Sequence, residues 1–135
     1  MASIDMKNDV KGLIALDIQA IASDTTTVGN IIDLAGFESV TFFQESGAYT
    51  DGSYTLLIEE GDDAALADAA AVADSSLVGT EADTAISAAN AVSSIGYVGG
   101  KRYVRASVVS ASVTTGATVG ALAVIGSPRH APVAQ

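Results

Sequence analysis

The sequence contains no cysteine and no tryptophan, and it has one histidine and two prolines among its 135 residues. Without cysteine, the chain has no disulfide framework, zinc finger, iron–sulfur site or thiol nucleophile. With a single histidine, most histidine-based metal sites and acid–base pairs are excluded as well. We therefore expect no catalytic residues, no metal site, no cofactor and no enzymatic activity.

Positive charge is also scarce, because six Lys and Arg residues stand against 16 Asp and Glu residues, for a formal net charge of −10. Nucleic acid requires a basic surface, so this charge argues against it and we expect no nucleic-acid partner. No apolar run approaches the ~20 residues that span a bilayer, so we expect no membrane partner. Lysines before residues 13–16 imitate an export signal, but Asp17 and Gln19 interrupt the apolar segment, which we interpret as a strand.

Large side chains are few, since the chain has four Tyr and three Phe residues but 25 alanines. Its length is that of one domain with a core of its own. Small side chains bury little area each, at about 25 cal/mol per Å² of apolar surface. Association with further copies or with a partner would add stability to such a thin core.

The clearest local signal is a turn at Asp51 and Gly52. It separates two β-rich runs, residues 37–44 and 54–59. An Asp-Gly pair in this setting is typical of a two-residue hairpin, whose two central residues both have positive φ. The pattern predicts a hairpin in which Tyr49 faces Tyr54 across the ladder.

Gly99 and Gly100 predict a second hairpin, between residues 95–98 and residues 101–108. Side chains alternate between the two faces of a strand, so one face of 101–108 is apolar and the other is basic and aromatic. The two sets are Val104, Ala106 and Val108 against Lys101, Tyr103 and Arg105.

A third turn at residues 114–117 leads into a strand over 118–125, and further strands are predicted over 13–21 and 28–34. The count is then about seven or eight short strands with glycine-marked turns. This arrangement favours an all-β fold, an antiparallel β-sandwich or a jelly-roll-like variant of it.

The middle and the ends of the chain differ in character. Residues 62–83 are rich in Ala and Asp, and we predict a long loop there with at most one short helix, followed by a strand over 84–92. We expect a single domain over 1–126, beginning with an N-terminal arm over 1–11. Both prolines fall in 127–135, which predicts an extended C-terminal arm.

Charge is unevenly distributed, with fourteen acidic residues and no basic one between Gly12 and Gly100. One interpretation is a pair of complementary surfaces through which copies or a partner dock. The other is a solvated acidic surface beside a basic strand face. The basic residues are Lys7, Lys11, Lys101, Arg102, Arg105 and Arg129.

Three segments suggest metal-binding, phosphate-binding or catalytic motifs, but each differs from the motif in its spacing or its surroundings. The acidic run over 59–63 does not match a calcium-binding loop, and it is interpreted as a solvated turn. The glycines before Lys101 do not match a phosphate-binding loop, because Ile95 and Arg102 occupy the positions of its first Gly and its Ser or Thr. His130, the single base, lies between two prolines near the end of the chain, a poor setting for proton transfer.

Residues 95–105, with 119–121 and 126–132, resemble small structural proteins of tailed bacteriophages and prophages. Residues 47–55 and 59–62 resemble the same group. The resemblance covers residues 36–63 and 95–132, and it contains no catalytic signature.

Within that group, the resemblance implies a capsid decoration (cement) protein, a small acidic β-domain that binds the outside of an expanded capsid, often as a trimer. It implies the major capsid protein and further copies of the chain as partners. The implied location is the outer capsid surface of the virion, after synthesis in the host cytoplasm. Two alternatives remain open: a tail or head–tail connector protein, and a non-viral β-sandwich binding module.

The contact residues expected from this interpretation lie in the basic strand and in the C-terminal arm. For the strand, the alternative is structural pairing with nearby carboxylates. For the arm, the alternative is a terminus that contacts nothing. The candidates are Lys101, Arg102, Tyr103 and Arg105 in the strand, and Pro128, Arg129, His130 and Pro132 in the arm.

Overall fold

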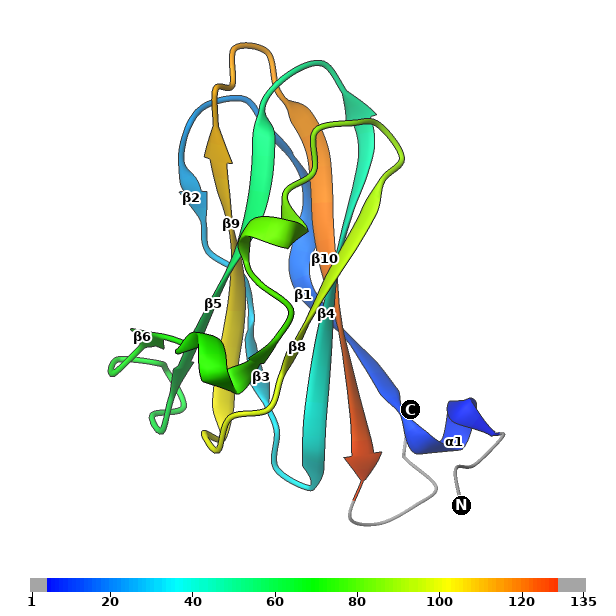
Figure 1. Cartoon of the computed structure of the whole chain (residues 1–135), viewed down its shortest axis with the longest axis vertical. Helices are drawn as coiled ribbons and strands as arrows, with labels where there is room; N and C mark the ends of the chain where they lie inside the picture. Colours follow the sequence, from blue (N-terminus) through cyan, green and yellow to red (C-terminus); the bar gives the residue numbers. More distant parts are fainter. Residues whose placement is uncertain (1–4, 129–135) are drawn as a thin grey trace.

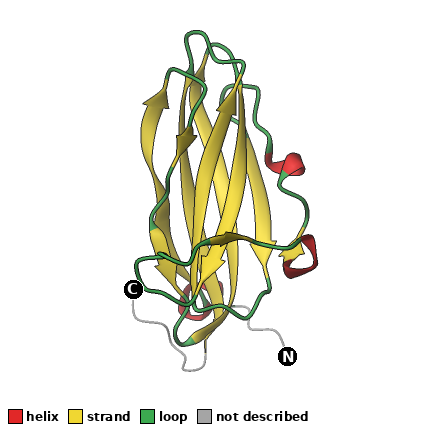
Figure 2. Cartoon of the chain, turned by 90° about the vertical axis from the view of Figure 1, so that its left-hand side faces the viewer, coloured by secondary structure: helices red, strands yellow, loops and turns green. Residues whose placement is uncertain are grey.

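A computed structural model describes residues 5–128 as two antiparallel β-sheets packed face to face, with the long strands along the long axis (Figures 1 and 2). The predicted β-sandwich is confirmed. The described residues form ten strands instead of seven or eight, because four are short segments of two or three residues. No helix among them is long and apolar enough to cross a membrane.

The first sheet has the strand order β1 (Lys11–Ile21), β10 (Ala117–Pro128), β4 (Phe37–Tyr49), β8 (Val92–Tyr97) and β7 (Leu77–Val78). The second sheet has the order β2 (Thr26–Thr27), β9 (Tyr103–Ala111), β5 (Ser53–Gly61) and β6 (Ala70–Ala71), and β3 (Ile31–Asp33) also pairs with β9. The short helices are α1 (Met6–Asp9), η1 (Asp74–Ser76) and η2 (Ala82–Thr84).

The core lies between the two sheets and follows the two-residue period of the strands. On β9, the predicted apolar face of Val104, Ala106 and Val108 is fully buried. Phe42 on β4 meets this layer from the first sheet and is fully buried too. The alternation predicted for the strand over 101–108 is therefore confirmed.

The two predicted hairpins are wrong, because in each case the two strands lie in different sheets. β4 lies in the first sheet and β5 in the second, so the chain crosses between layers at Asp51 and Gly52. Tyr49 and Tyr54 do meet, with ring centroids 6.4 Å apart and planes at 81°, but not as partners in a ladder. Of the turn pair, Gly52 alone has a positive φ, +98°.

The other two connections also change sheets, from β8 to β9 and from β9 to β10. Neither Gly99 nor Gly100 has a positive φ, so the tight hairpin turn expected there does not form. The physical reason is the core itself. Strands that cross between layers turn their apolar faces toward each other and bury them, whereas a hairpin would leave both faces on one side of one sheet.

Asp51 ties together two of these crossings. Its carboxylate accepts hydrogen bonds from the backbone N–H groups of Thr114, Thr115 and Gly116, at donor–acceptor distances of 3.0, 3.0 and 2.9 Å. The bond from Thr114 is the main cause that holds the pKa of Asp51 below its usual value. The β4–β5 connection is therefore fixed by the β9–β10 connection.

The segment predicted as a long loop over 62–83 is mostly loop, but the limit of one short helix is wrong: η1 and two two-residue strands lie inside it and η2 lies at its end. The strand predicted over 84–92 is wrong, since β8 begins at Val92. The buried Thr84 explains the difference, because its Oγ1 accepts from the backbone N–H of Leu56 and donates to the carbonyl of Glu81. Side-chain hydrogen bonds and one backbone bridge, between Ile86 and Tyr54, hold this segment against β5 in place of a continuous ladder.

Gln44 is a polar residue in the middle of the core, and it is fully buried. Its Nε2 donates to the carbonyl of Tyr54 at 3.0 Å. Its Oε1 has no hydrogen-bond partner among the described residues. The Tyr54 carbonyl also accepts from the backbone N–H of Ile86 at 2.9 Å, so it does not depend on Gln44.

Replacing Gln44 by methionine should therefore stabilise the protein. Methionine has a similar shape, and the change removes a buried unpaired acceptor whose desolvation costs about 1–3 kcal/mol. We expect the free energy of unfolding, measured in urea, to rise by about 1 kcal/mol. A loss of stability in the Gln44→Met variant would show that Oε1 is bonded in solution.

The described ends of the chain lie at the same end of the sandwich (Figure 1). Residues 6–9 form one helical turn, and Lys11 already belongs to β1. β10 continues to Pro128, which pairs with Phe37. Three candidate contact residues, Arg129, His130 and Pro132, lie outside the described residues.

Candidate functional site

The structure brings the four strand candidates together at one end of the sandwich. Lys101 and Arg102 lie in the connection between β8 and β9, and Tyr103 begins β9. Arg105 follows two residues later, on the outer face of the second sheet. We call these four residues the cationic end.

Arg102 forms a two-bond ion pair with Asp33. Its Nε lies 2.8 Å from Oδ1 and its Nη2 lies 3.0 Å from Oδ2 of that carboxylate. The guanidinium also lies 5.0 Å from the centre of the Tyr103 ring, within cation–π distance. The Arg102 hydrogen bond is the main cause that lowers the pKa of Asp33. With side chains 56% and 46% exposed, this pair stabilises the fold little and stays accessible to a partner.

Arg105 is held more firmly than Arg102. It lies directly opposite Glu59 in the β5–β9 ladder, and its Nη2 is 2.8 Å from Oε1 of that residue. The two side chains are only 17% and 22% exposed. Arg105 therefore mainly forms a cross-strand ion pair within the second sheet. This matches the alternative that the basic strand pairs with nearby carboxylates of its own fold.

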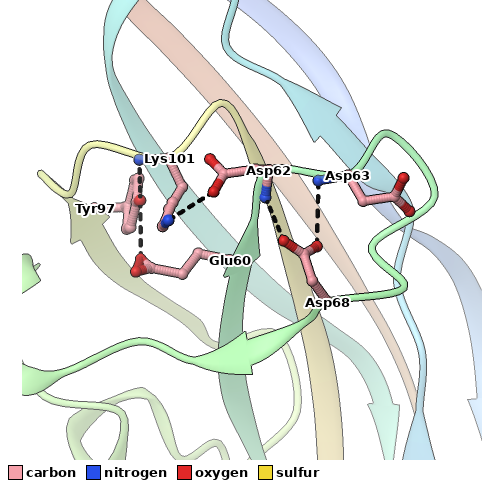
Figure 3. Close-up of polar contacts among 6 residues, drawn as sticks. All are labelled: Glu60, Asp62, Asp63, Asp68, Tyr97 and Lys101. Atoms are coloured by element: carbon pink, nitrogen blue, oxygen red, sulfur yellow. Dashed lines mark hydrogen bonds and ion pairs between the residues drawn. The ribbon is translucent and has the colours of Figure 1, made fainter.

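Lys101 is anchored through both its backbone and its side chain (Figure 3). Its backbone N–H donates to the hydroxyl oxygen of Tyr97 at 3.1 Å, and that hydroxyl donates to Oε2 of Glu60 at 3.0 Å. The ammonium group lies 2.7 Å from Oδ2 of Asp62, which raises the pKa of Lys101. Burial is the main cause that raises the pKa of Tyr97 to about 12, so the hydroxyl remains a donor at neutral pH.

Asp68 organises the acidic turn that faces Lys101 (Figure 3). Its carboxylate accepts hydrogen bonds from the backbone N–H groups of Asp62 and Asp63, at donor–acceptor distances of 2.9 and 3.2 Å. The bond from Asp62 is the main cause that lowers the pKa of Asp68. The interpretation of residues 59–63 as a solvated turn holds only for Asp62 and Asp63, which are exposed, because residues 59–61 belong to β5. Among residues 5–128, no group of three or more His, Asp and Glu side chains is arranged to hold a metal ion.

A hollow of about 370 Å³ opens beside the cationic end. It lies between the β3–β4 connection and the β8–β9 connection, and Lys101 and Arg102 form part of its wall. The remaining wall combines apolar, small and acidic residues: Leu34, Ala35, Gly36, Phe37, Glu38, Gly99 and Gly100. We call it the end hollow. Its mixed lining suits a protruding protein segment better than a small cofactor.

Sequence reasoning found the cations and missed the groups that position them. Asp33, Glu59 and Asp62 come from three other segments, so no local spacing connects them to Lys101, Arg102 and Arg105. One of these positioning groups, the Tyr97 hydroxyl, did have a signal in the sequence, namely Gly99. A Cβ at Gly99 would lie 2.5 Å from the Tyr97 hydroxyl, so a glycine two residues after a buried tyrosine marks where that hydroxyl packs.

No protein-family model matches the chain, and no curated protein matches its sequence. Among solved structures, the chain is similar to the PBSX exported protein XepA, with a TM-score of 0.60 and 18% identity. That match covers 93% of this chain but 40% of XepA, so the chain spans less than half of that protein. It is also similar to the SPBc2 prophage-derived protein YomS, with a TM-score of 0.50 and 19% identity, over 86% of this chain and 93% of YomS. At these identities the similarity is one of fold.

Proposed function

We propose that this protein is a virion structural protein of a tailed phage, a decoration protein that binds the outside of the capsid and bridges neighbouring capsid subunits. The observation that carries the proposal is the fold similarity to the prophage-derived YomS, which extends over most of both chains. The resemblance of residues 36–63 and 95–132 to phage structural proteins supports the same assignment. The partner is then the major capsid protein, and the protein is not an enzyme.

The cationic end and the end hollow form the capsid-binding surface in this proposal. Lys101 and Arg102 have side chains 45% and 56% exposed, although each already contacts a carboxylate. A capsid carboxylate can join or replace Asp62 and Asp33 at low cost, because exposed ion pairs are weak. Many such weak contacts repeated over the shell act together through multivalency, and the bridges oppose opening of the shell under the pressure of packaged DNA.

The number of copies per particle tests the function directly. Quantitative mass spectrometry of purified virions should give a simple ratio of this chain to the major capsid protein, because a decoration protein covers the whole shell. A few copies per particle would indicate the tail or head–tail connector alternative. Complete absence from virions would favour a non-viral binding module, and either result would overturn the decoration role.

Removing the two exposed cations should weaken docking on isolated capsids. We expect the Lys101→Ala, Arg102→Ala double variant to bind about 10-fold more weakly or worse, with a smaller dependence on salt, since two charged contacts are lost. The matched control is Lys7→Ala, Lys11→Ala, which removes the same charge outside the lining of the end hollow. Equal binding by both variants in low salt would contradict the assignment of this surface.

A further inference from the structure

The outer face of the first sheet carries a continuous apolar patch. Ile14 on β1 pairs in register with Leu122 on β10, and Leu122 pairs with Phe43 on β4. These three side chains therefore form a row across three adjacent strands, and they are 54%, 40% and 37% exposed. Ile18 and Val92 border the row and are 68% and 66% exposed. We call these five residues the apolar face.

The apolar face is nearly free of charge on a strongly acidic molecule. Its row and the neighbouring register row from Gly120 through Glu45 to Val92 contain one charged residue, Glu45. The outer face of the second sheet differs, since it holds the ion pair of Arg105 and Glu59. Scattered exposed apolar side chains need no explanation, but a contiguous patch of this kind marks a contact surface.

Strand β1 excludes one way of covering this patch. β1 is the edge strand of the first sheet, and its pairing with β10 shifts register between Ile14 and Leu16 and again between Leu16 and Gln19. Irregularities of this kind hinder edge-to-edge addition of another strand. A partner that covers this patch therefore lies across the face of the sheet and does not extend the sheet at β1.

A shallow hollow in the apolar face is shaped for the face's own side chains. Its volume is about 160 Å³, and the side chains around it include Ile14, Ile18, Phe43 and Leu122. That volume accommodates one large apolar side chain. In a two-fold pair, an exposed apolar side chain of each copy can enter the hollow of the other, because a two-fold contact uses the same surface twice.

The area of the sheet also fits a stable pair. At about 3.4 Å per residue and about 4.8 Å per strand, β1, β10, β4 and β8, with 11, 12, 13 and 6 residues, together present about 690 Å². A standard interface buries about 800 Å² on each partner. Two sheets stacked in this way lie about 10 Å apart, the usual spacing of face-to-face packing.

Charge favours a second copy over a basic partner. A basic surface would gain little from a face with one carboxylate, and the acidic residues elsewhere would attract it more strongly. For two copies, each with a net charge of −10, this is the region where they can meet with few carboxylates opposed. We propose that the apolar face binds a second copy of this chain in a two-fold, face-to-face dimer. The proposal does not depend on the capsid role.

Salt dependence separates this contact from capsid docking. Two acidic copies repel each other, and salt screens that repulsion over a Debye length of about 8–10 Å. Dimerisation should therefore strengthen as salt rises, whereas docking through the cationic end should weaken. The dimer also differs in mass from the trimer that the family resemblance implies.

The test is sedimentation equilibrium of the purified full chain in low and high salt. At about 100 µM we expect a mass twice the 13.5 kDa of one chain. Leu122→Asp should raise the dissociation constant at least about 100-fold, since it opposes two buried carboxylates across the two-fold axis. The matched control is Val109→Asp on the outer face of the second sheet, where Val109 is 38% exposed and Leu122 is 40% exposed. This control should dimerise as the parent does.

Ile18→Asp is a second variant whose folding is not in question, because Ile18 is 68% exposed on the edge strand. It should also dissociate the dimer, with unchanged circular dichroism. A single-chain mass at every concentration overturns the proposal, as does a trimer or a dimer that both Asp variants leave intact. If the parent chain is a monomer and the Leu122→Asp variant no longer binds capsids, the apolar face binds a capsid protein, and this result also overturns the dimer proposal. Sedimentation of the purified chain does not depend on its copy number in virions. The dimer proposal and the decoration role can therefore be contradicted independently of each other.

Discussion

Replacing Phe42 by alanine is expected to lower the free energy of unfolding by about 3–5 kcal/mol. Phe42 is fully buried between the sheets, where its ring fills a core that otherwise consists largely of smaller side chains. The substitution removes apolar contacts and leaves a cavity that the two sheets cannot close, because their spacing is fixed by the other core residues. Urea unfolding followed by circular dichroism measures the change.

The neighbouring residue supplies a matched control. Phe43 points to the opposite side of β4 and is 37% exposed. Phe43→Ala deletes the same atoms from the surface, so we expect it to lower the free energy of unfolding by about 1 kcal/mol or less at low protein concentration. Similar losses from the two variants would mean that β4 does not alternate between core and solvent as the structure has it.

Replacing Gly29 by alanine is the second large effect, with an expected loss of at least about 3 kcal/mol. A Cβ at Gly29 would lie 1.9 Å from the carbonyl oxygen of Ala106 and 2.5 Å from that of Ala15. Ala106 belongs to β9 in the second sheet and Ala15 to β1 in the first. The backbone at Gly29 therefore lies against both sheets, and a methyl group would force them apart. Thermal unfolding by calorimetry would show the loss.

Gly100→Ala is the control for this prediction. Nothing lies within 4 Å of a Cβ built at Gly100, and its φ is not positive. Alanine there restricts the unfolded chain without strain, so stability should stay within about 0.5 kcal/mol of the parent or rise. A wild-type melting temperature for Gly29→Ala would show that the segment can move away from β1 and β9.

The sequence predicts the strands of this fold better than it predicts their partners. Alternation identifies the buried face of β9 because the two-residue period is a local property of a strand. The choice of sheet is not local. Asp51 and Gly52 reverse the chain equally well within one sheet or between two, and only the opposing apolar layer decides that β4 and β5 separate.

The same distinction applies to the candidate site. Lys101, Arg102 and Tyr103 are consecutive, so the sequence places them together whatever the fold. Their partners Asp33 and Asp62 are 69 and 39 residues away, and tertiary structure alone brings them within hydrogen-bond distance. The apolar face was missed for a related reason. Ile14, Phe43 and Leu122 form one row only after β1, β10 and β4 have paired.

The pairing of β1 with β10 has a consequence for how the protein is made. β1 lies near the start of the chain and its partner near the end, with Lys11 opposite Ile125. During synthesis, β1 therefore emerges from the ribosome long before the strand that it pairs with. Because β4 also pairs with β10, the first sheet can form completely only after β10 has left the ribosome. Folding is thus a late, collective event, and no surface of the first sheet exists for assembly before translation has passed β10.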